Sequence, residues 1–285
     1  MDVLFAGNRA HVLREMIRTG LRPRRIFAVK GSYLERELVA DGITFEELPA
    51  RAAFIDLLLA ERFDLFLSNG CPVLLPILKL KGRERKHFVN IHPSCLPDLR
   101  GVDPVPGALL HGRDSGATCH VMDDGIDTGG LISQVRIPFS EDLDAGLLYQ
   151  LSFIAEAEAY IAAAAVDFQP QKEGGKAPGT VYYTFKPEHL RIDWSEPLEA
   201  IVHRIKAFGT KSKGAWFEVD GRRVVVRDAE PVMNSYLLEH GSAYEDREVV
   251  FAYERKLLVR HREGFIKLKD LDGAWEQAKP GMAIS

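Results

Sequence analysis

Short hydrophobic runs alternate with amphipathic stretches through the first half of the chain. The runs predict strands at residues 3–6, 25–29, 43–48, 65–68 and 88–91. The stretches between them have helical spacing at residues 9–19, 33–41 and 52–62. Near-continuous apolar strands are typical of parallel sheets that helices cover on both faces. The order therefore predicts an α/β fold with a doubly wound, mostly parallel, Rossmann-like sheet.

A longer helical pattern covers residues 145–167, and its alanine-rich second half favours close packing. Residues 169–179 follow, with two prolines, two lysines and three glycines. Such a segment is too polar and too rich in helix and strand breakers for a core element. We therefore expect two domains, at residues 1–175 and 180–285.

The second domain reads as one helix followed by short strands. Residues 195–208 have helical spacing, and residues 216–226 predict a hairpin around Asp220 and Gly221, the pair that a type I′ turn favours. Further strands are expected at residues 249–253, 257–260 and 265–268. This spacing predicts a small, OB-like β-barrel, with no internal repeat.

The composition excludes several classes of protein. Of the 285 residues, 46% are apolar and 27% charged, as in ordinary globular proteins, and no apolar run approaches the roughly 18 residues of a membrane span. The first residues lack the basic flank of a signal peptide, so we expect a cytoplasmic protein without membrane association. Cys71, Cys95 and Cys119 are too widely spaced for paired zinc ligands, and no metal is expected.

The strand expected at residues 88–91 carries the first candidate chemistry. Alternate residues of a strand face the same side, so Asn90 and His92 project together. Pro93 cannot donate to a sheet ladder, which places His92 at the carboxyl edge, where open α/β sheets bind ligands. The first strand ends in Gly7-Asn8 and lacks the Gly-x-Gly-x-x-Gly pattern of dinucleotide binding, which disfavours NAD.

A second polar cluster lies between strands expected at residues 117–122 and 131–137. Asp123, Asp124 and Asp127 stand within five positions, among several glycines. Carboxylates this close repel one another unless a cationic group approaches. His92 is a candidate for that group, although an exposed hairpin turn would show the same composition.

These residues resemble the folate-dependent formyltransferases. The family pattern is visible as Asn90-Ile-His92-Pro-Ser94-Cys-Leu96-Pro97, Arg100-Gly101, Thr118-Cys-His120-Val-Met122 and Asp127-Thr-Gly129. The resemblance continues at Ser68-Asn-Gly-Cys-Pro, Arg191-Ile-Asp-Trp, Ile205-Lys-Ala-Phe and Lys213-Gly-Ala, so it covers nearly the whole chain. Several motifs in the same order are far more specific than any single one.

The resemblance implies an N-formyltransferase that uses 10-formyltetrahydrofolate, with Asn90, His92 and Asp127 as the catalytic residues. The Asn90 amide suits a developing oxyanion, and His92 could act as a base or as a protonated oxyanion donor. Asp127 would pair with His92 and orient its ring. The family's folate contacts fall on Asn69, Gly70, Asp123, Asp124 and Gly125, and His120 is expected to be structural.

The acceptor amine is the open choice. The family includes enzymes that act on nucleotide-linked amino sugars, on methionyl-tRNA and on hydroxyornithine-type siderophore precursors. Residues 29–33 pass almost at once into a helix, without the long basic loop of the tRNA enzymes, and from residue 180 onward seventeen Lys and Arg balance seventeen Asp and Glu. We therefore expect a small nucleotide-linked amino sugar, with tRNA second and hydroxyornithine third, and a possible homodimer.

Overall fold

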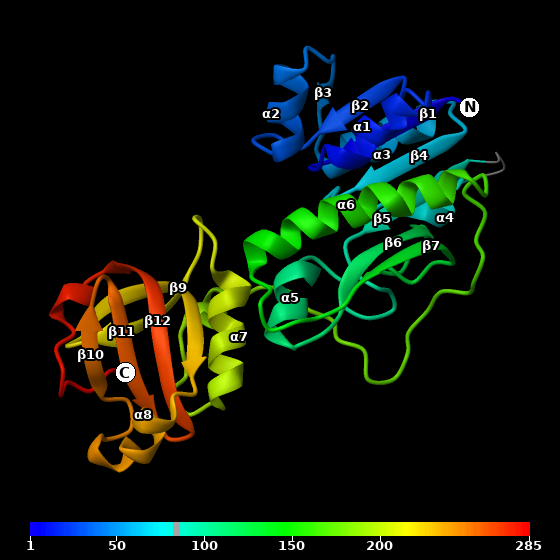
Figure 1. Ribbon diagram of the computed structural model, residues 1–285. Coiled ribbons are helices and arrows are strands. Elements are labelled where there is room, and N and C mark those ends of the chain that lie inside the picture. Colours follow the sequence, from blue (N-terminus) through cyan, green and yellow to red (C-terminus); the bar gives the residue numbers. More distant parts are fainter. Residues whose placement is uncertain (82–85) are drawn as a thin grey trace. The chain divides into compact units, whose positions relative to one another are not determined.

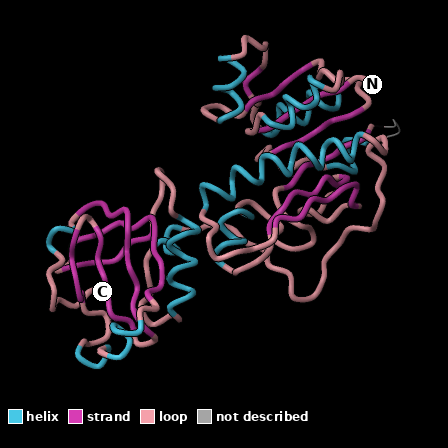
Figure 2. Tube along the Cα trace, in the orientation of Figure 1, coloured by secondary structure: helices cyan, strands magenta, loops and turns pink. Residues whose placement is uncertain are grey.

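The computed structural model describes residues 1–81 and 86–285, and the chain divides into two compact units (Figure 1). The first unit comprises residues 1–104, 114–138 and 149–183. The second comprises residues 105–113, 139–148 and 184–285. The predicted domain limits at residues 175 and 180 remain a proposal, which limited proteolysis between residues 169 and 179 would test. That segment runs as a loop (Figure 2).

The first unit is built on one seven-stranded sheet in the order β3-β2-β1-β4-β5-β6-β7. The strands are β1 (Val3–Gly7), β2 (Arg25–Ala28), β3 (Glu46–Glu47), β4 (Leu65–Asn69), β5 (His87–His92), β6 (Ser115–Val121) and β7 (Leu131–Ile137). The five strands β1 to β5 run parallel, whereas β6 and β7 are antiparallel to their neighbours. This confirms the predicted α/β class and the mostly parallel sheet.

Helices cover both faces of this sheet, as the apolar strands require. The helices that cover it are α1 (His11–Arg18), α2 (Tyr33–Ala40), α3 (Arg51–Ala60), α4 (Ile77–Lys81) and most of α6 (Ala145–Ala164), whereas α5 (Pro104–Leu110) belongs almost wholly to the second unit. Val3 and Phe5 of β1 pack in one core with residues of α1, α2 and α6, whereas Leu4 and Ala6 pack in another with α3 and α4. Ala155, Ala159 and Ala163 bring α6 close to the sheet, as their small size predicted.

The second unit, called the C-terminal unit below, holds a five-stranded antiparallel sheet in the order β10-β11-β12-β9-β8. Its elements are α7 (Leu198–Phe208), β8 (Ala215–Val219), β9 (Arg222–Val232), α8 (Ser235–Glu239), β10 (Val249–Tyr253), β11 (Lys256–His261) and β12 (Gly264–Gly273). The hairpin turns at Asp220 and Gly221, both with positive φ, as predicted. Several expected elements are shorter than predicted. For example, α7 begins at Leu198 and not at residue 195, and β3 keeps only two residues, at the sheet edge.

The last residues of the chain join the two edge strands of this sheet. Val249 of β10 donates to the Met282 carbonyl (2.8 Å), and Ile284 donates to the Arg247 carbonyl (3.0 Å). On the other side, the backbones of Ser285 and Glu218 of β8 exchange two hydrogen bonds (3.0 and 2.8 Å). Residues 281–285 therefore contact both edge strands of an antiparallel sheet that is itself open, and the predicted closed barrel stays a prediction. Among the described residues, no helix is long and apolar enough to cross a bilayer.

Replacing Ile284 with alanine should destabilise the C-terminal unit. The side chain is 2% exposed within the hydrophobic core of this unit, and shortening a buried isoleucine costs about 2–5 kcal/mol of unfolding free energy. Urea unfolding would measure the loss. Ser285→Ala, next along the chain and exposed, should leave the unfolding free energy unchanged; equal stability of both variants would contradict this role of the C-terminal segment.

Candidate active site

The candidate site lies where β5 ends, in the middle of the sheet. Asn90 is half-buried, and His92, the last residue of the strand, is 5% exposed. The antiparallel register of β5 with β6 sets Asn90 opposite His120 and His92 opposite Thr118. The structure therefore brings Asn90 and His92 together at the carboxyl edge, as their alternate spacing predicted.

The loop after β5 fixes the orientation of the His92 ring. Leu99 has a left-handed backbone (φ 55°), uncommon for a residue with a side chain, and its carbonyl lies 2.9 Å from Nε2 of His92. A carbonyl oxygen can only accept, so Nε2 carries the hydrogen and Nδ1 is the nitrogen left for chemistry. Burial lowers the pKa of His92, and the Asp127 charge and the Leu99 contact only partly offset this. His92 is therefore neutral at pH 7.

Asp127 joins the loop after β5 to the turn between β6 and β7. Its Oδ2 accepts a hydrogen bond from the Gly101 backbone (3.0 Å) and lies 3.6 Å from Nδ1 of His92, and its Oδ1 lies 3.5 Å from Nε2 of His120. Burial acts to raise the pKa of Asp127, but the contacts with His120 and His92 outweigh it and hold the pKa at about 2. Asp127 is thus ionised at neutral pH.

His120, expected to be structural, is buried and hydrogen-bonded, and its ring also contacts this cluster. Its Nδ1 lies 3.0 Å from the Val121 carbonyl and therefore carries a hydrogen. Its Nε2 lies 3.2 Å from the Asn90 amide nitrogen and accepts that N–H when unprotonated. His120 thus fixes which way the Asn90 amide points, and leaves its oxygen and second N–H for a ligand.

The other two carboxylates of the turn have local partners. Oδ1 of Asp123 accepts from the Gly125 backbone (3.0 Å) and the Thr128 hydroxyl (2.8 Å), and Oδ1 of Asp124 accepts from the Leu78 backbone (3.0 Å). The repulsion expected from three adjacent carboxylates is therefore relieved by hydrogen bonds to neutral groups for two of them. Only Asp127 turns to the histidines.

A recess adjoins Asn90, His120 and Asp127. Its lining combines polar groups with apolar side chains, from Ser68, Cys71, Val73, Leu74, Leu75, Met122, Asp123, Asp124, Gly125 and Ile126. Three of the predicted folate-binding residues, Asp123 to Gly125, line it. Asn69 and Gly70 do not: the Asn69 side chain is fully buried, and its amide nitrogen donates to the Ile91 carbonyl (3.2 Å).

Thr118 is a second supporting residue that the sequence reasoning named only as part of a motif. Its buried hydroxyl donates to the Ser94 carbonyl (2.6 Å) and accepts from the Leu96 backbone (3.1 Å) and the Gln134 amide (2.9 Å). These bonds fasten the loop after β5 to β6 and β7. The position of Leu99, and with it the His92 ring, depends on this loop.

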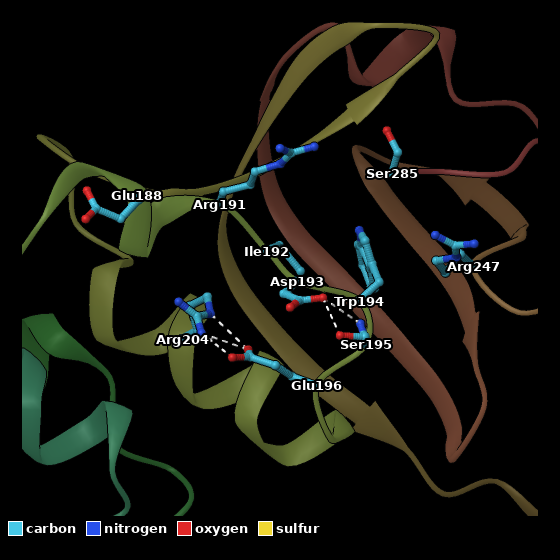
Figure 3. Close-up of a pocket in the computed structure, with 10 residues that line it drawn as sticks. All are labelled: Glu188, Arg191, Ile192, Asp193, Trp194, Ser195, Glu196, Arg204, Arg247 and Ser285. Atoms are coloured by element: carbon cyan, nitrogen blue, oxygen red, sulfur yellow. Dashed lines mark hydrogen bonds and ion pairs between the residues drawn. The ribbon is translucent and has the colours of Figure 1, made fainter.

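Another hollow lies in the C-terminal unit (Figure 3). Within it, Arg204 forms a forked ion pair with Glu196 (2.6 and 2.8 Å), and Asp193 accepts from the Ser195 hydroxyl and backbone (2.6 and 2.9 Å). None of the predicted site residues lines it. The recess beside Asn90 is therefore the stronger candidate for chemistry.

Within the described ranges 1–81 and 86–285, one group of three side chains has metal-ligand spacing, in the C-terminal unit. His203 is buried, and its Nε2 lies 3.1 Å from Oε1 of Glu141 and 4.0 Å from Oε1 of Glu199. Both carboxylates are largely exposed. A hydrogen-bonded histidine explains this group without a metal, and none of its members belongs to the predicted catalytic set.

Comparison with known protein families gives two matches along the chain. Residues 39–164 match the family model described as formyl transferase, and residues 184–278 match the formyl transferase C-terminal domain. Together the matches cover most of the chain and both structural units.

Curated relatives carry the name methionyl-tRNA formyltransferase. The protein of Synechococcus sp. (strain JA-2-3B'a(2-13)) is 27% identical over 223 residues, which span 75% of this chain and 68% of the relative. The protein of Acidothermus cellulolyticus is 37% identical over 159 residues, 52% of this chain and 47% of the relative. The stronger identity thus comes from about half of each protein.

Two solved structures share the fold over nearly the whole chain. The sugar 3N-formyl transferase WlaRD, solved with dTDP and 5-N-formyl-THF, has a TM-score of 0.71 and 18% identity, covering 94% of this chain and 97% of its own. The N-formyltransferase of Helicobacter canadensis, with folinic acid and dTDP-3-aminofucose, has a TM-score of 0.72 and 16% identity, covering 95% and 100%. At such identities these likenesses show the fold alone.

Replacing His120 with phenylalanine should raise the pKa of Asp127. The variant keeps a flat ring but removes the nitrogen whose contact with Asp127, together with that of His92, outweighs burial and holds this pKa at about 2. NMR titration of the Asp127 carboxyl would follow the midpoint, with His240→Phe in the C-terminal unit as control. The low pKa also stabilises the fold above about pH 4, an advantage lost as the pH falls through 2. An unchanged midpoint in His120→Phe would exclude this role.

Proposed function

Because the chain belongs to the formyltransferase family, we propose that it transfers the formyl group of 10-formyltetrahydrofolate to the amine of a nucleotide-linked sugar. Formyl transfer is supported chiefly by the cluster of Asn90, His92 and Asp127 at the carboxyl end of β5, beside a recess. A neutral nitrogen base, an ionised carboxylate and an oriented amide meet there.

The recess suits the folate. Val73, Leu74, Leu75 and Ile126 supply apolar surface for a flat ring, and the turn at Asp123 to Gly125 supplies polar groups at its rim. The bound folate supplies the formyl group and later accepts a proton at the released nitrogen. The recess opens onto Asn90 and Asp127, so a formyl group held there would lie beside the Asn90 amide.

The catalytic residues divide the work as follows. The N–H of Asn90 that His120 leaves available donates to the formyl oxygen as negative charge develops on it. Neutral His92 accepts the proton that the attacking amine releases, at Nδ1, since Nε2 is held by the Leu99 carbonyl. Asp127 lies 3.6 Å from that nitrogen and stabilises the imidazolium. This arrangement favours the base over the protonated oxyanion donor for His92.

Two observations favour a small nucleotide-linked acceptor. The solved structures with this fold include a sugar 3N-formyl transferase with dTDP and an N-formyltransferase with dTDP-3-aminofucose. In this chain β2 ends at Ala28 and α2 begins at Tyr33, which leaves no room for a long basic loop. The second candidate is methionyl-tRNA, which the names of the curated relatives favour. A cytoplasmic homodimer is part of the proposal, and sedimentation of the purified protein would test the dimer.

The direct assay follows tetrahydrofolate release from 10-formyltetrahydrofolate with nucleotide-linked amino sugars, methionyl-tRNA and hydroxyornithine as acceptors. Asn90→Ala should lower kcat by about 10²–10³-fold, the typical loss for an oxyanion donor. The control is Asn234→Ala, which removes a helix cap in the C-terminal unit and should leave kcat unchanged. Release with tRNA alone would contradict the sugar acceptor, and equal kcat in both variants would contradict the role of Asn90.

The dependence of kcat/KM on pH should show that His92 acts as a base. Because His92 works unprotonated and burial lowers its pKa below the ordinary 6.5, kcat/KM should stay high at pH 6.5 and fall only as the pH drops through that lower pKa. Asp127→Asn removes the charge that partly raises this pKa, so the acid limb should move to lower pH while kcat decreases. A limb that moves to higher pH would contradict the assignment of His92 as base.

A further inference from the structure

A buried ion pair that the proposed chemistry does not use lies at the carboxyl end of β1. The Arg9 guanidinium, whose side chain is 15% exposed, contacts the Glu156 carboxylate of α6, which is fully buried. The same guanidinium lies 5.5 Å from the centre of the Phe153 ring, three residues earlier on α6. Two contacts from one helix face thus fix a cation beside the sheet edge.

The side chain of Asn69 contacts Glu156, and three side-chain oxygens of this group have no hydrogen-bond donor of their own in the described part of the chain. Among the described residues, Oδ1 of Asn8, Oδ1 of Asn69 and Oε2 of Glu156 are buried and lack a hydrogen-bond partner. Asn8 and Asn69 are neighbours, since the Asn8 backbone donates to the Asn69 carbonyl (3.1 Å). A buried oxygen without a hydrogen-bond donor destabilises the fold, and a ligand with hydroxyl or N–H donors would relieve this cost. The Arg9 guanidinium and several hydrogen-bond acceptors therefore belong to one polar group.

This polar group and the folate recess adjoin different cores of the sheet. Leu75 of the recess belongs to the core that contains α3 and α4, and Met122 packs against that core. Ala10, next to Arg9, and Ala155, next to Glu156, belong to the core that contains α1 and α6. His92 is the last residue of β5. Burial lowers its pKa, and the positive charge of Arg9 lowers that pKa further. With the folate in its recess, the Arg9 side is left for the acceptor.

We propose that Arg9, anchored by Glu156, is a specificity-determining residue that binds the diphosphate of the acceptor. The guanidinium fork matches two phosphate oxygens at once, and the oxygens of Asn8, Asn69 and Glu156 suit the hydroxyl groups of a linked sugar. Glu156 is a positioning residue, because it holds Arg9 against α6. The inference rests on the proposed function, since it assumes a nucleotide-linked acceptor.

The test compares the binding of thymidine and uridine diphosphates with that of the matching nucleosides, by calorimetry, without any formyl transfer. Arg9→Ala would leave the Glu156 carboxylate buried and unpaired and could prevent folding. The test variants are therefore Arg9→Lys, which keeps the charge but loses the fork, and the double variant Arg9→Gln with Glu156→Gln, which removes both charges. Arg14→Gln is the control, since Arg14 pairs with half-exposed Glu37 and Asp41 on the surface of α1.

In the wild type and in Arg14→Gln, we expect the favoured diphosphate to bind at least tenfold more tightly than its nucleoside. In Arg9→Lys this difference in affinity should be smaller. In the double variant the diphosphate and its nucleoside should bind equally well, while the KM for the folate stays the same. If the double variant still binds the diphosphate more tightly than the nucleoside, the role of Arg9 is overturned and the proposed function stands. If the wild type neither binds a diphosphate nor formylates any nucleotide-linked sugar, the proposed function itself fails.

Discussion

The site depends on one carboxylate that is held between two loops. Asp127 accepts the Gly101 N–H and faces both imidazoles, so it ties the loop after β5 to the turn after β6. Because both histidines use their other nitrogen on a backbone carbonyl, each turns its remaining nitrogen towards Asp127. A buried carboxylate in this place fixes where protons can reside, and the amide of Asn90 is oriented through the same network.

Much of this arrangement could be predicted from local sequence patterns. The alternation within residues 88–92 and Pro93 placed Asn90 and His92 at a strand end, and the breaker-rich segment at residues 169–179 is a loop. The contact between His120 and Asn90 could not be predicted, because the two residues lie on strands thirty positions apart. Only the antiparallel register that sets Asn90 opposite His120 reveals it, and that register is a property of the sheet. Likewise, no local pattern shows that Asp123 and Asp124 find neutral hydrogen-bond partners.

The same limit explains why Arg9 and Glu156 could not be connected from the sequence. A lone arginine after a strand and a glutamate within an alanine-rich helix each have an ordinary reading as surface residues. They meet because α6 packs its small side chains closely over the sheet and brings its buried face to the end of β1. Burial of both charges is costly unless they pair, so the close packing of α6 makes the pair obligatory. The small alanine side chains of α6 therefore allow close packing of the core and also bring Glu156 to Arg9.

The central claim is that His92 is a neutral base whose Nε2 holds the hydrogen. Nitrogen NMR of the labelled protein at pH 7 tests this directly, because the two nitrogens of a neutral ring and those of an imidazolium resonate differently. The account predicts a neutral His92 ring with hydrogen on Nε2 and an unprotonated Nδ1 facing Asp127. An imidazolium at pH 7, or hydrogen on Nδ1 alone, would contradict it.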